Sequence, residues 1–218
     1  MLGSSASVAS PNVVLNTAVA EALAQFYKEL EGTAPEDMET AVHELIKRAI
    51  RKHKKVIFNG NGYTDEWIKE AEERGLYNLV STPDALPQFI ADKNIELFTK
   101  HSVFTKEEIY SRYEILLENY VKTINIESKT LQEMLTKDFI PAVNGYAAEV
   151  AVNANEKKAL IEGLATTAEE SIVKELTEAS NTLSAKVAEL KAVTEKADAA
   201  AEEDMQKAAE SFHKDVLT

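Results

Sequence analysis

The sequence predicts a mainly α-helical protein, a helical bundle that ends in long antiparallel helices and has few or no strands. Glycine and proline, which most often break helices, number only 7 and 5 in 218 residues. Alanine, glutamate, lysine and leucine are abundant, and this composition favours helix over strand. Apolar residues also recur at intervals of three and four, the spacing of one buried helix face.

The first half of the chain, residues 1–104, is predicted to hold short helices with structured loops. Ser10 as N-cap and Pro11 at the first helical position open the first helix, and Gly32 ends it. The spacing of its apolar residues predicts a buried stripe, formed by Leu15, Val19, Ala22, Leu23, Phe26 and Leu30.

Two further helices are predicted before residue 76. Thr33 and Glu36 have the spacing of a capping box for the second helix. Its apolar face is formed by Val42, Leu45, Ile46, Ala49 and Ile50. A short apolar run and an Asn-Gly turn follow over 56–63, and then a helix capped by Thr64 and stopped by Gly75. Residues 76–91 are expected to be loop with one helical turn, and 92–100 a short helix.

The second half, residues 105–218, is predicted to consist of long helices. Thr105 and Glu108 form a capping box, and Phe104 and Ile109 occupy the two positions of a hydrophobic staple. The helix that they open meets no breaker before Pro141, which should kink or interrupt it.

The last part of the chain, from residue 155 onward, is rich in alanine, glutamate and lysine and keeps an apolar rhythm close to a heptad. This pattern predicts one or two long helices packed as a hairpin. The predicted seam consists of Ile172, Leu176, Ala179, Leu183, Val187, Leu190 and Val193.

Composition narrows the class of function. The formal net charge is −13, so binding of a nucleic acid would need a local basic patch, and no nucleic-acid partner is expected. No apolar run approaches the roughly 20 residues of a membrane span, so no membrane partner is expected either. The chain has no cysteine, which excludes disulfides and thiolate metal sites and suits a cytoplasmic location.

Three patterns could carry chemistry, each with a plainer structural explanation. Glu210 and His213 have the spacing of a di-iron ligand pair, but that site needs the motif twice. The glycine-rich run 59–62 precedes a helix and could cradle a phosphate, or it could simply form a tight turn. The basic run 47–55 could contact RNA or an anionic surface, or it could be a solvated helix end.

Three runs of residues resemble type III glutamine synthetases in family order. The first contains Gly3-Ser4-Ser5 and then 10–23, the second is Ile57-Phe58-Asn59-Gly60-Asn61-Gly62-Tyr63-Thr64-Asp65-Glu66-Trp67 with 70–76, and the third extends from Leu97 to Glu127. Together they cover roughly residues 3–145, while the tail resembles the family's helical C-terminus in character only.

The resemblance implies a ligase that makes glutamine from glutamate and ammonia with ATP and Mg²⁺ or Mn²⁺. In the family, the metal ligands and ATP-binding strands precede the matched region, so this chain looks like a C-terminal piece that begins just after the last catalytic strand. No catalytic, cofactor-binding or metal-binding residue is therefore assigned. Ser4 and Ser5 are the residues that could adjoin the active site.

The piece alone is expected to be inactive and to have a structural role. Residues 1–31 should pack on the catalytic barrel, so Val14, Leu15 and Val19 should be exposed in this chain by itself. The implied partners are the rest of the polypeptide and other subunits, because the family forms double hexameric rings. The alternative readings are a free-standing helical scaffold or interaction protein, and an RNA- or anion-binding module that uses residues 47–55.

Overall fold

The computed structural model describes residues 7–217, so Ser4 and Ser5 lie outside the described residues. The described chain is helical throughout and contains no strand, which confirms the predicted fold class. The chain divides into two compact units, Met1–Tyr113 and Glu114–Thr218. The division falls inside one long helix, α6 (Lys106–Met134), beyond the position at residue 104 that the sequence predicts.

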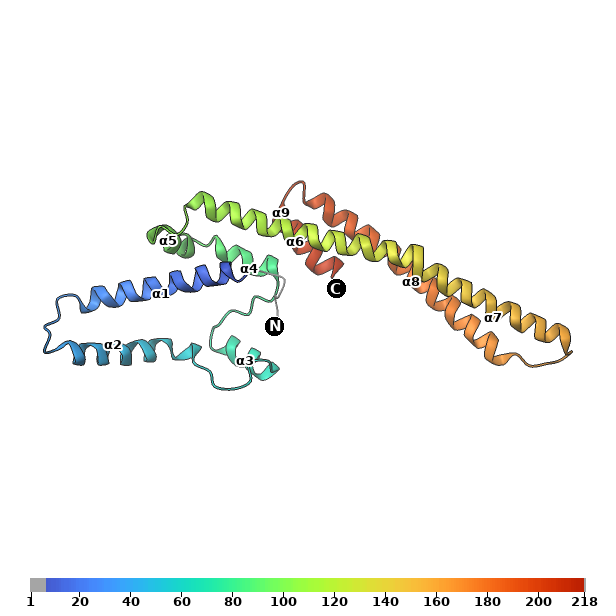
Figure 1. Cartoon of the computed structure of the whole chain (residues 1–218), viewed down its shortest axis with the longest axis horizontal. Helices are drawn as coiled ribbons and strands as arrows, with labels where there is room; N and C mark the ends of the chain where they lie inside the picture. Colours follow the sequence, from blue (N-terminus) through green and yellow to red (C-terminus); the bar gives the residue numbers. More distant parts are fainter. Residues whose placement is uncertain (1–6, 218) are drawn as a thin grey trace. The chain divides into compact units, whose positions relative to one another are not determined.

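The first unit is built from five short or medium helices and the start of α6. Helices α1 and α2 lie side by side and run in opposite directions (Figure 1). Helix α5 also packs against α1, and α4 packs against α5. The bounds are α1 (Ala9–Leu30), α2 (Met38–His53), α3 (Asp65–Glu73), α4 (Thr82–Phe89) and α5 (Asp92–Lys100).

Two predicted helix starts are wrong. Helix α1 begins at Ala9 with Val8 at its N-cap, so Ser10 is already helical. The capping box of Thr33 and Glu36 does not form, because a turn closed by Asp37 N–H and the carbonyl of Ala34 delays the start of α2 to Met38. Helix α4 makes residues 76–91 more helical than predicted.

Predicted helix ends, by contrast, are confirmed where glycine takes the left-handed conformation. Gly75 has φ of +69° after α3, the N–H of Leu76 donates to the carbonyl of Ala71 at 2.9 Å, and that of Gly75 donates to Glu72 at 2.8 Å. This is a Schellman motif, which stops a helix and satisfies its last carbonyls.

The connection between α5 and α6 shows the same motif without glycine. Ser102 takes φ of +54°, the N–H of Val103 donates to the carbonyl of Phe98, and that of Ser102 donates to Thr99. The left-handed conformation costs a residue with a side chain roughly 1–2 kcal/mol. Phe98, which is 2% exposed, sits between the rings of Phe89 and Phe104 and fixes this corner.

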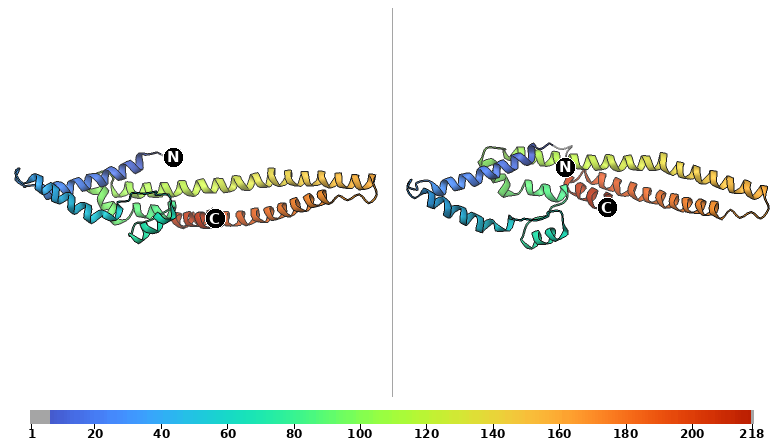
Figure 2. Two further views of the ribbon diagram at one scale, coloured as in Figure 1. Left: turned by 90° about the horizontal axis from the view of Figure 1, so that it is seen from below. Right: turned by 60° about the horizontal axis from the view of Figure 1, so that its bottom comes forward.

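The second unit is a long helical hairpin. It contains the rest of α6, a π-helical segment (Leu135–Phe139), α7 (Ile140–Leu160), α8 (Thr167–Ala200), α9 (Met205–Ser211) and a second π-helical segment (Phe212–Val216). Helices α7 and α8 lie side by side in opposite directions in both views of Figure 2. The long antiparallel helices predicted for the C-terminal part of the chain are therefore confirmed, but the long partner of α8 is α7, which lies mostly before residue 155.

Three of the seven predicted seam residues of α8 are displaced by one position: Val173, Ser180 and Thr194 replace Ile172, Ala179 and Val193. Ile172 is 38% exposed, and Val173 takes its place in the seam. Ser180 and Thr194 are buried, with exposures of 6% and 1%. The inward-facing residues then repeat at alternating steps of three and four, as in a heptad: Val173, Leu176, Ser180, Leu183, Val187, Leu190, Thr194 and Ala197.

Pro141 interrupts the long helix, as the sequence predicts, and the interruption takes the form of the π-helical segment just before it. Along the facing helices the inward residues again repeat at steps of three and four, except for one step of five from Leu135 to Ile140. The π segment adds one residue to the turn. It thereby keeps Ala147, Val150 and Ala154 on the buried side, at 6–8% exposure.

A layer of polar side chains crosses the hairpin where α6 meets α8. The buried hydroxyls of Ser128 and Thr194 are 2.7 Å apart, and Gln132 Nε2 donates to both, at 3.1 and 3.2 Å. One step further, Asn125 Nδ2 and Lys129 Nζ contact the carboxylate of Asp198, at 2.6 and 3.0 Å. Polar layers of this kind specify the register of paired helices.

The chain after α8 folds back on that helix. Asp204 Oδ1 caps α9 by accepting from the N–H groups of Gln206 and Lys207, at 3.0 and 3.2 Å. Ala208, Ala209 and Phe212 are fully buried, because α9 and the π segment after it pack on α8.

Candidate functional site

Helix α1 turns its apolar face outward. Leu15, Val19, Leu23 and Tyr27 are 63%, 56%, 61% and 66% exposed, and their steps of four place them on one side of the helix. The predicted burial is therefore wrong for Leu15, Val19 and Leu23, because periodicity identifies a face but not its partner, whereas the other members of the predicted stripe, Ala22, Phe26 and Leu30, are half-buried. The separate expectation that Val14, Leu15 and Val19 are exposed in this chain by itself is confirmed.

The inner face of α1 is polar instead. Thr17 is its most buried residue, at 4% exposure, and its hydroxyl donates to the carbonyl of Val13 at 2.7 Å. One turn on, the Glu21 carboxylate accepts from Lys100 Nζ and contacts His101 Nε2, each at 2.6 Å. Since Lys100 and His101 end α5, these contacts fix α1 to α5 through charge rather than through apolar packing.

The contacts of Glu21 stabilise its ionised form. Hydrogen bonds from Lys100, Gln25 and His101 lower the pKa of the Glu21 carboxyl from 4.5 to about 2. The side chain is 18% exposed, so the pair lies at the edge of the helix contact and not in the core. Sequence reasoning missed this cluster, because Glu21 and Lys100 are far apart in the chain and no local spacing links them.

A broad open hollow of 750 Å³ lies beside the C-terminal half of α1 and includes Lys100 at the end of α5. Leu23, Ala24 and Tyr27 contribute to its mostly apolar lining, and Glu21, Lys28, Glu31 and Lys100 contribute charge. A mixture of apolar carbon and charged groups is typical of a surface that receives another protein segment.

The second of the three runs that resemble the family, which begins at Ile57, forms a loop before α3 that is held by side-chain contacts. The rings of Phe58 and Trp67 stack with centroids 3.8 Å apart, and the Arg74 guanidinium lies over Trp67. Arg74 Nη1 also donates to the carbonyls of Lys55 and Ile57, at 3.2 and 2.9 Å. Arg74 therefore fixes the entrance of the loop to the end of α3.

The glycine-rich part of this loop has a packing role. A Cβ on Gly60 would lie 2.6 Å from the Phe58 ring, so only glycine fits beneath that ring. The Asn61 side-chain oxygen accepts from the N–H of Tyr63 at 3.1 Å and closes a turn. These contacts account for the run 59–62 as a tight turn, and Tyr63 at its tip is 95% exposed.

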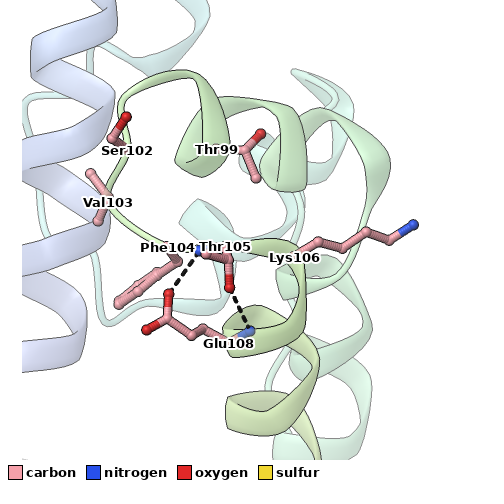
Figure 3. A pocket seen from close by; sticks show the side chains of 7 residues that line it. All are labelled: Thr99, Ser102, Val103, Phe104, Thr105, Lys106 and Glu108. Carbon is pink, nitrogen blue, oxygen red and sulfur yellow. Dashed lines mark hydrogen bonds between the residues drawn. The ribbon is translucent and has the colours of Figure 1, made fainter.

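A second hollow, of 390 Å³, lies where α5 meets α6 (Figure 3). Its polar groups bond to one another: the N–H of Thr105 donates to Glu108 Oε2 at 2.8 Å, and the N–H of Glu108 donates to Thr105 Oγ1 at 3.2 Å. The predicted capping box is thus confirmed, and Ile109 at the staple position is fully buried. The hollow therefore belongs to the packed connection between α5 and α6.

The remaining candidate residues do not assemble into a reaction centre. His43 and His53 are exposed, and Glu210 bonds to Gln206 on its own helix. Within residues 7–217, no three His, Cys, Asp or Glu side chains are placed to hold a metal ion. Over the same residues, no helix is both long and apolar enough to cross a membrane.

The described residues thus form an all-α domain with an unpartnered apolar helix face. Residues 41–158 match the sequence model of the glutamine synthetase C-terminal domain. The chain is also 44% identical over 170 residues to a glutamine synthetase of Butyrivibrio fibrisolvens, and 39% identical over 156 residues to a type-3 glutamine synthetase of Dictyostelium discoideum. The chain therefore belongs to the family of the glutamine synthetase C-terminal domain, and its resemblance to type III enzymes is confirmed.

The matches cover most of this chain but only a small part of each relative. They take in 78% and 71% of the chain, but 24% and 21% of the two relatives. A glutamine synthetase of Bacteroides fragilis matches at 29% identity over 66% of the chain and 20% of the relative. The chain thus spans about a quarter or less of the relatives' length.

Proposed function

We propose that this chain is the helical C-terminal domain of a cytoplasmic type III glutamine synthetase, and that it packs on the catalytic part of the enzyme without supplying catalytic residues. The 44% identity over 170 residues to a glutamine synthetase, of which this match covers 24%, carries the proposal. ATP, a divalent Mg²⁺ or Mn²⁺ ion, glutamate and ammonia are then ligands of that catalytic part. The domain's contribution is structural, both within one subunit and in the assembly of subunits.

The outward apolar face of α1 is the surface that we assign to the catalytic part. The polar inner face is already bonded to α5 through Glu21, so the orientation of α1 is fixed within its own unit. The four large side chains Leu15, Val19, Leu23 and Tyr27 then remain in water. Covering one such side chain stabilises a complex by about 1.5–3 kcal/mol at most, which is a strong reason for this face to have a partner.

An assay of the chain alone tests the first part of the proposal. Purified chain incubated with ATP, glutamate, ammonia and Mg²⁺ should form no glutamine above a blank. Glutamine formation by this chain would contradict the absence of catalytic residues.

A chimaera tests the second part. The quarter of the Butyrivibrio fibrisolvens enzyme that matches this chain is replaced by the chain itself, and glutamine formation and particle size are measured. The chimaera should be active and assembled, whereas the same chimaera with Leu15→Glu and Val19→Glu should lose both properties. A chimaera with Ile68→Glu and Val80→Glu is the matched control, because these residues are 43% and 79% exposed in the same unit but lie outside α1.

The outcomes distinguish a failure of the proposed function from a failure of the role assigned to α1. An inactive, unassembled wild-type chimaera would contradict the proposed function. An active chimaera that tolerates the α1 changes as well as the control changes would contradict the role of α1 alone.

A further inference from the structure

The C-terminal end of α2 and the 3₁₀ turn that follows it (Lys54–Val56) form a basic edge, which we define as Arg51, Lys52, Lys54 and Lys55. All four side chains are exposed, and none of them forms an ion pair with a described residue. The two cations before them are neutralised, since Lys47 pairs with Glu44 and Arg48 pairs with Glu29. The basic edge is therefore a concentrated, unpaired positive charge on a chain of net charge −13.

The basic edge is also held in place. Arg74 donates to the carbonyls of Lys55 and Ile57, and the stack of Phe58 on Trp67 fixes the chain that follows. A charged edge on a fixed backbone loses less conformational entropy on binding than a flexible tail does. This organisation favours a specific partner over a diffuse one.

Charge balance points to the partner. The second unit, Glu114–Thr218, holds 20 Asp and Glu residues against 11 Lys and Arg residues. Three acids on α8 pair with a lysine of their own helix: Glu178 with Lys174, Glu189 with Lys186 and Glu195 with Lys191. Several other exposed acids of this unit form no ion pair in the described chain, and among them Glu202 and Glu203 are the two that are adjacent in sequence. They follow the C-terminal end of α8, whose macrodipole adds negative potential.

We propose that the basic edge of one copy binds the acidic end of α8, at Glu202 and Glu203, in a second copy of this chain. The two surfaces differ, so the contact is heterologous and can repeat from copy to copy. Isolated surface ion pairs contribute little, and for this reason the contact relies on several charges that act together on fixed backbones.

Sedimentation equilibrium of the full chain tests the contact. The dissociation constant should rise at least about tenfold between about 0.05 M and about 0.5 M sodium chloride, because salt screens exposed charges. Self-association through the apolar face of α1 would not weaken in salt, so the two modes are separable. Association that is independent of protein concentration, or insensitive to salt, would overturn the proposal.

Variants locate the two surfaces. Lys54→Glu with Lys55→Glu should raise the low-salt dissociation constant at least about tenfold. Lys69→Glu with Lys174→Glu is the matched control, because it changes net charge equally at two exposed lysines outside both the basic edge and the acidic end of α8, and it should leave association intact. Equal weakening by both pairs would mean that only overall charge matters, against the proposal.

A charge exchange completes the test. Copies with Lys54→Glu and Lys55→Glu, and copies with Glu202→Lys and Glu203→Lys, should each fail to self-associate at low salt. Mixed together, they should associate again, since each altered edge meets a complementary one. Circular dichroism checks that both variants stay folded. Folded variants that do not associate when mixed would refute the pairing of these two surfaces, and binding of a single-stranded RNA probe in place of a second copy would assign the basic edge to a different partner.

Discussion

The polar layer inside the hairpin provides a quantitative test of how α6 and α8 are held together. Thr194 has one hydroxyl proton, and its oxygen lies 2.6 Å from the carbonyl of Leu190. If that proton bonds to the carbonyl, Ser128 donates to Thr194 and accepts from Gln132. Gln132, Ser128 and Thr194 then form a chain of hydrogen bonds, in which Ser128 accepts from Gln132 and donates to Thr194.

The single changes should have unequal costs. Thr194→Val keeps the shape of the side chain but leaves the buried Ser128 hydroxyl without its acceptor, which costs about 1–3 kcal/mol of unfolding free energy. Ser128→Ala removes the donor while Thr194 keeps Leu190 and Gln132, so its cost is about 0.5–1.5 kcal/mol.

The double variant should cost less than the sum of the two single variants. With both hydroxyls gone, no buried donor is left unpaired, and Gln132, which is partly exposed, can bond to water. We expect a coupling of about 1 kcal/mol, within the range for residues of one hydrogen-bond network.

Urea unfolding followed by far-ultraviolet circular dichroism measures these free energies from the midpoints and slopes. Trp67 is the only tryptophan and lies in the first unit, so its fluorescence reports on that unit separately. Strictly additive costs in the double variant would refute the reasoning, because they would show that the two hydroxyls act independently.

Three further predictions follow from single sites. Phe212→Ala should lower the unfolding free energy by about 3–5 kcal/mol, because the ring is fully buried, whereas Phe139→Ala, at a half-exposed ring, should cost far less in the same urea titration. Ser102→Gly should raise stability by up to about 1 kcal/mol in thermal unfolding, since glycine adopts the left-handed conformation without the steric cost, and a loss of stability would contradict that account. Glu21 has a folded pKa of about 2, below its ordinary 4.5, so its contribution to stability is complete above pH 4.5 and is lost as the pH falls toward 2. Hydrogen-exchange protection factors of α1, which correct for the intrinsic exchange rate at each pH, should fall over that interval and should not do so in Glu21→Gln.

Local signals predicted local structure well. The capping box of Thr105 and Glu108, the stop at Gly75 and the interruption near Pro141 depend on residues within a few positions of one another, and all three are present. The Thr33 box failed for an equally local reason, since a turn at residues 34–37 comes between it and α2.

Sequence patterns that identify one face of a helix, but not what packs against it, predicted burial less reliably. The period of α1 identified an apolar face, but only the pairing of Glu21 with Lys100 and His101 decides that this face points to water. In α8, the apolar residues alone placed Ile172 in the seam. The buried Ser180 and Thr194 show that polar side chains carry the same rhythm and set the register at Val173. The sequence shows both the apolar spacing of α1 and the run of basic residues at the basic edge. Only the structure shows that no described residue covers the first or pairs with the second.

The π-helical segment lets the first arm of the hairpin hold one residue more than a strict repeat of three and four allows. In a regular α-helix one residue corresponds to a rotation of about 100°. The wider turn at Leu135–Phe139 absorbs the extra residue, so the inward face continues from α6 into α7. If the segment became regular α-helix with its length unchanged, α7 would rotate by about that angle and Ala147, Val150 and Ala154 would turn toward water. Deleting one residue there would instead leave steps of three and four throughout, so this is the place in the arm where a change of length by a single residue preserves the seam.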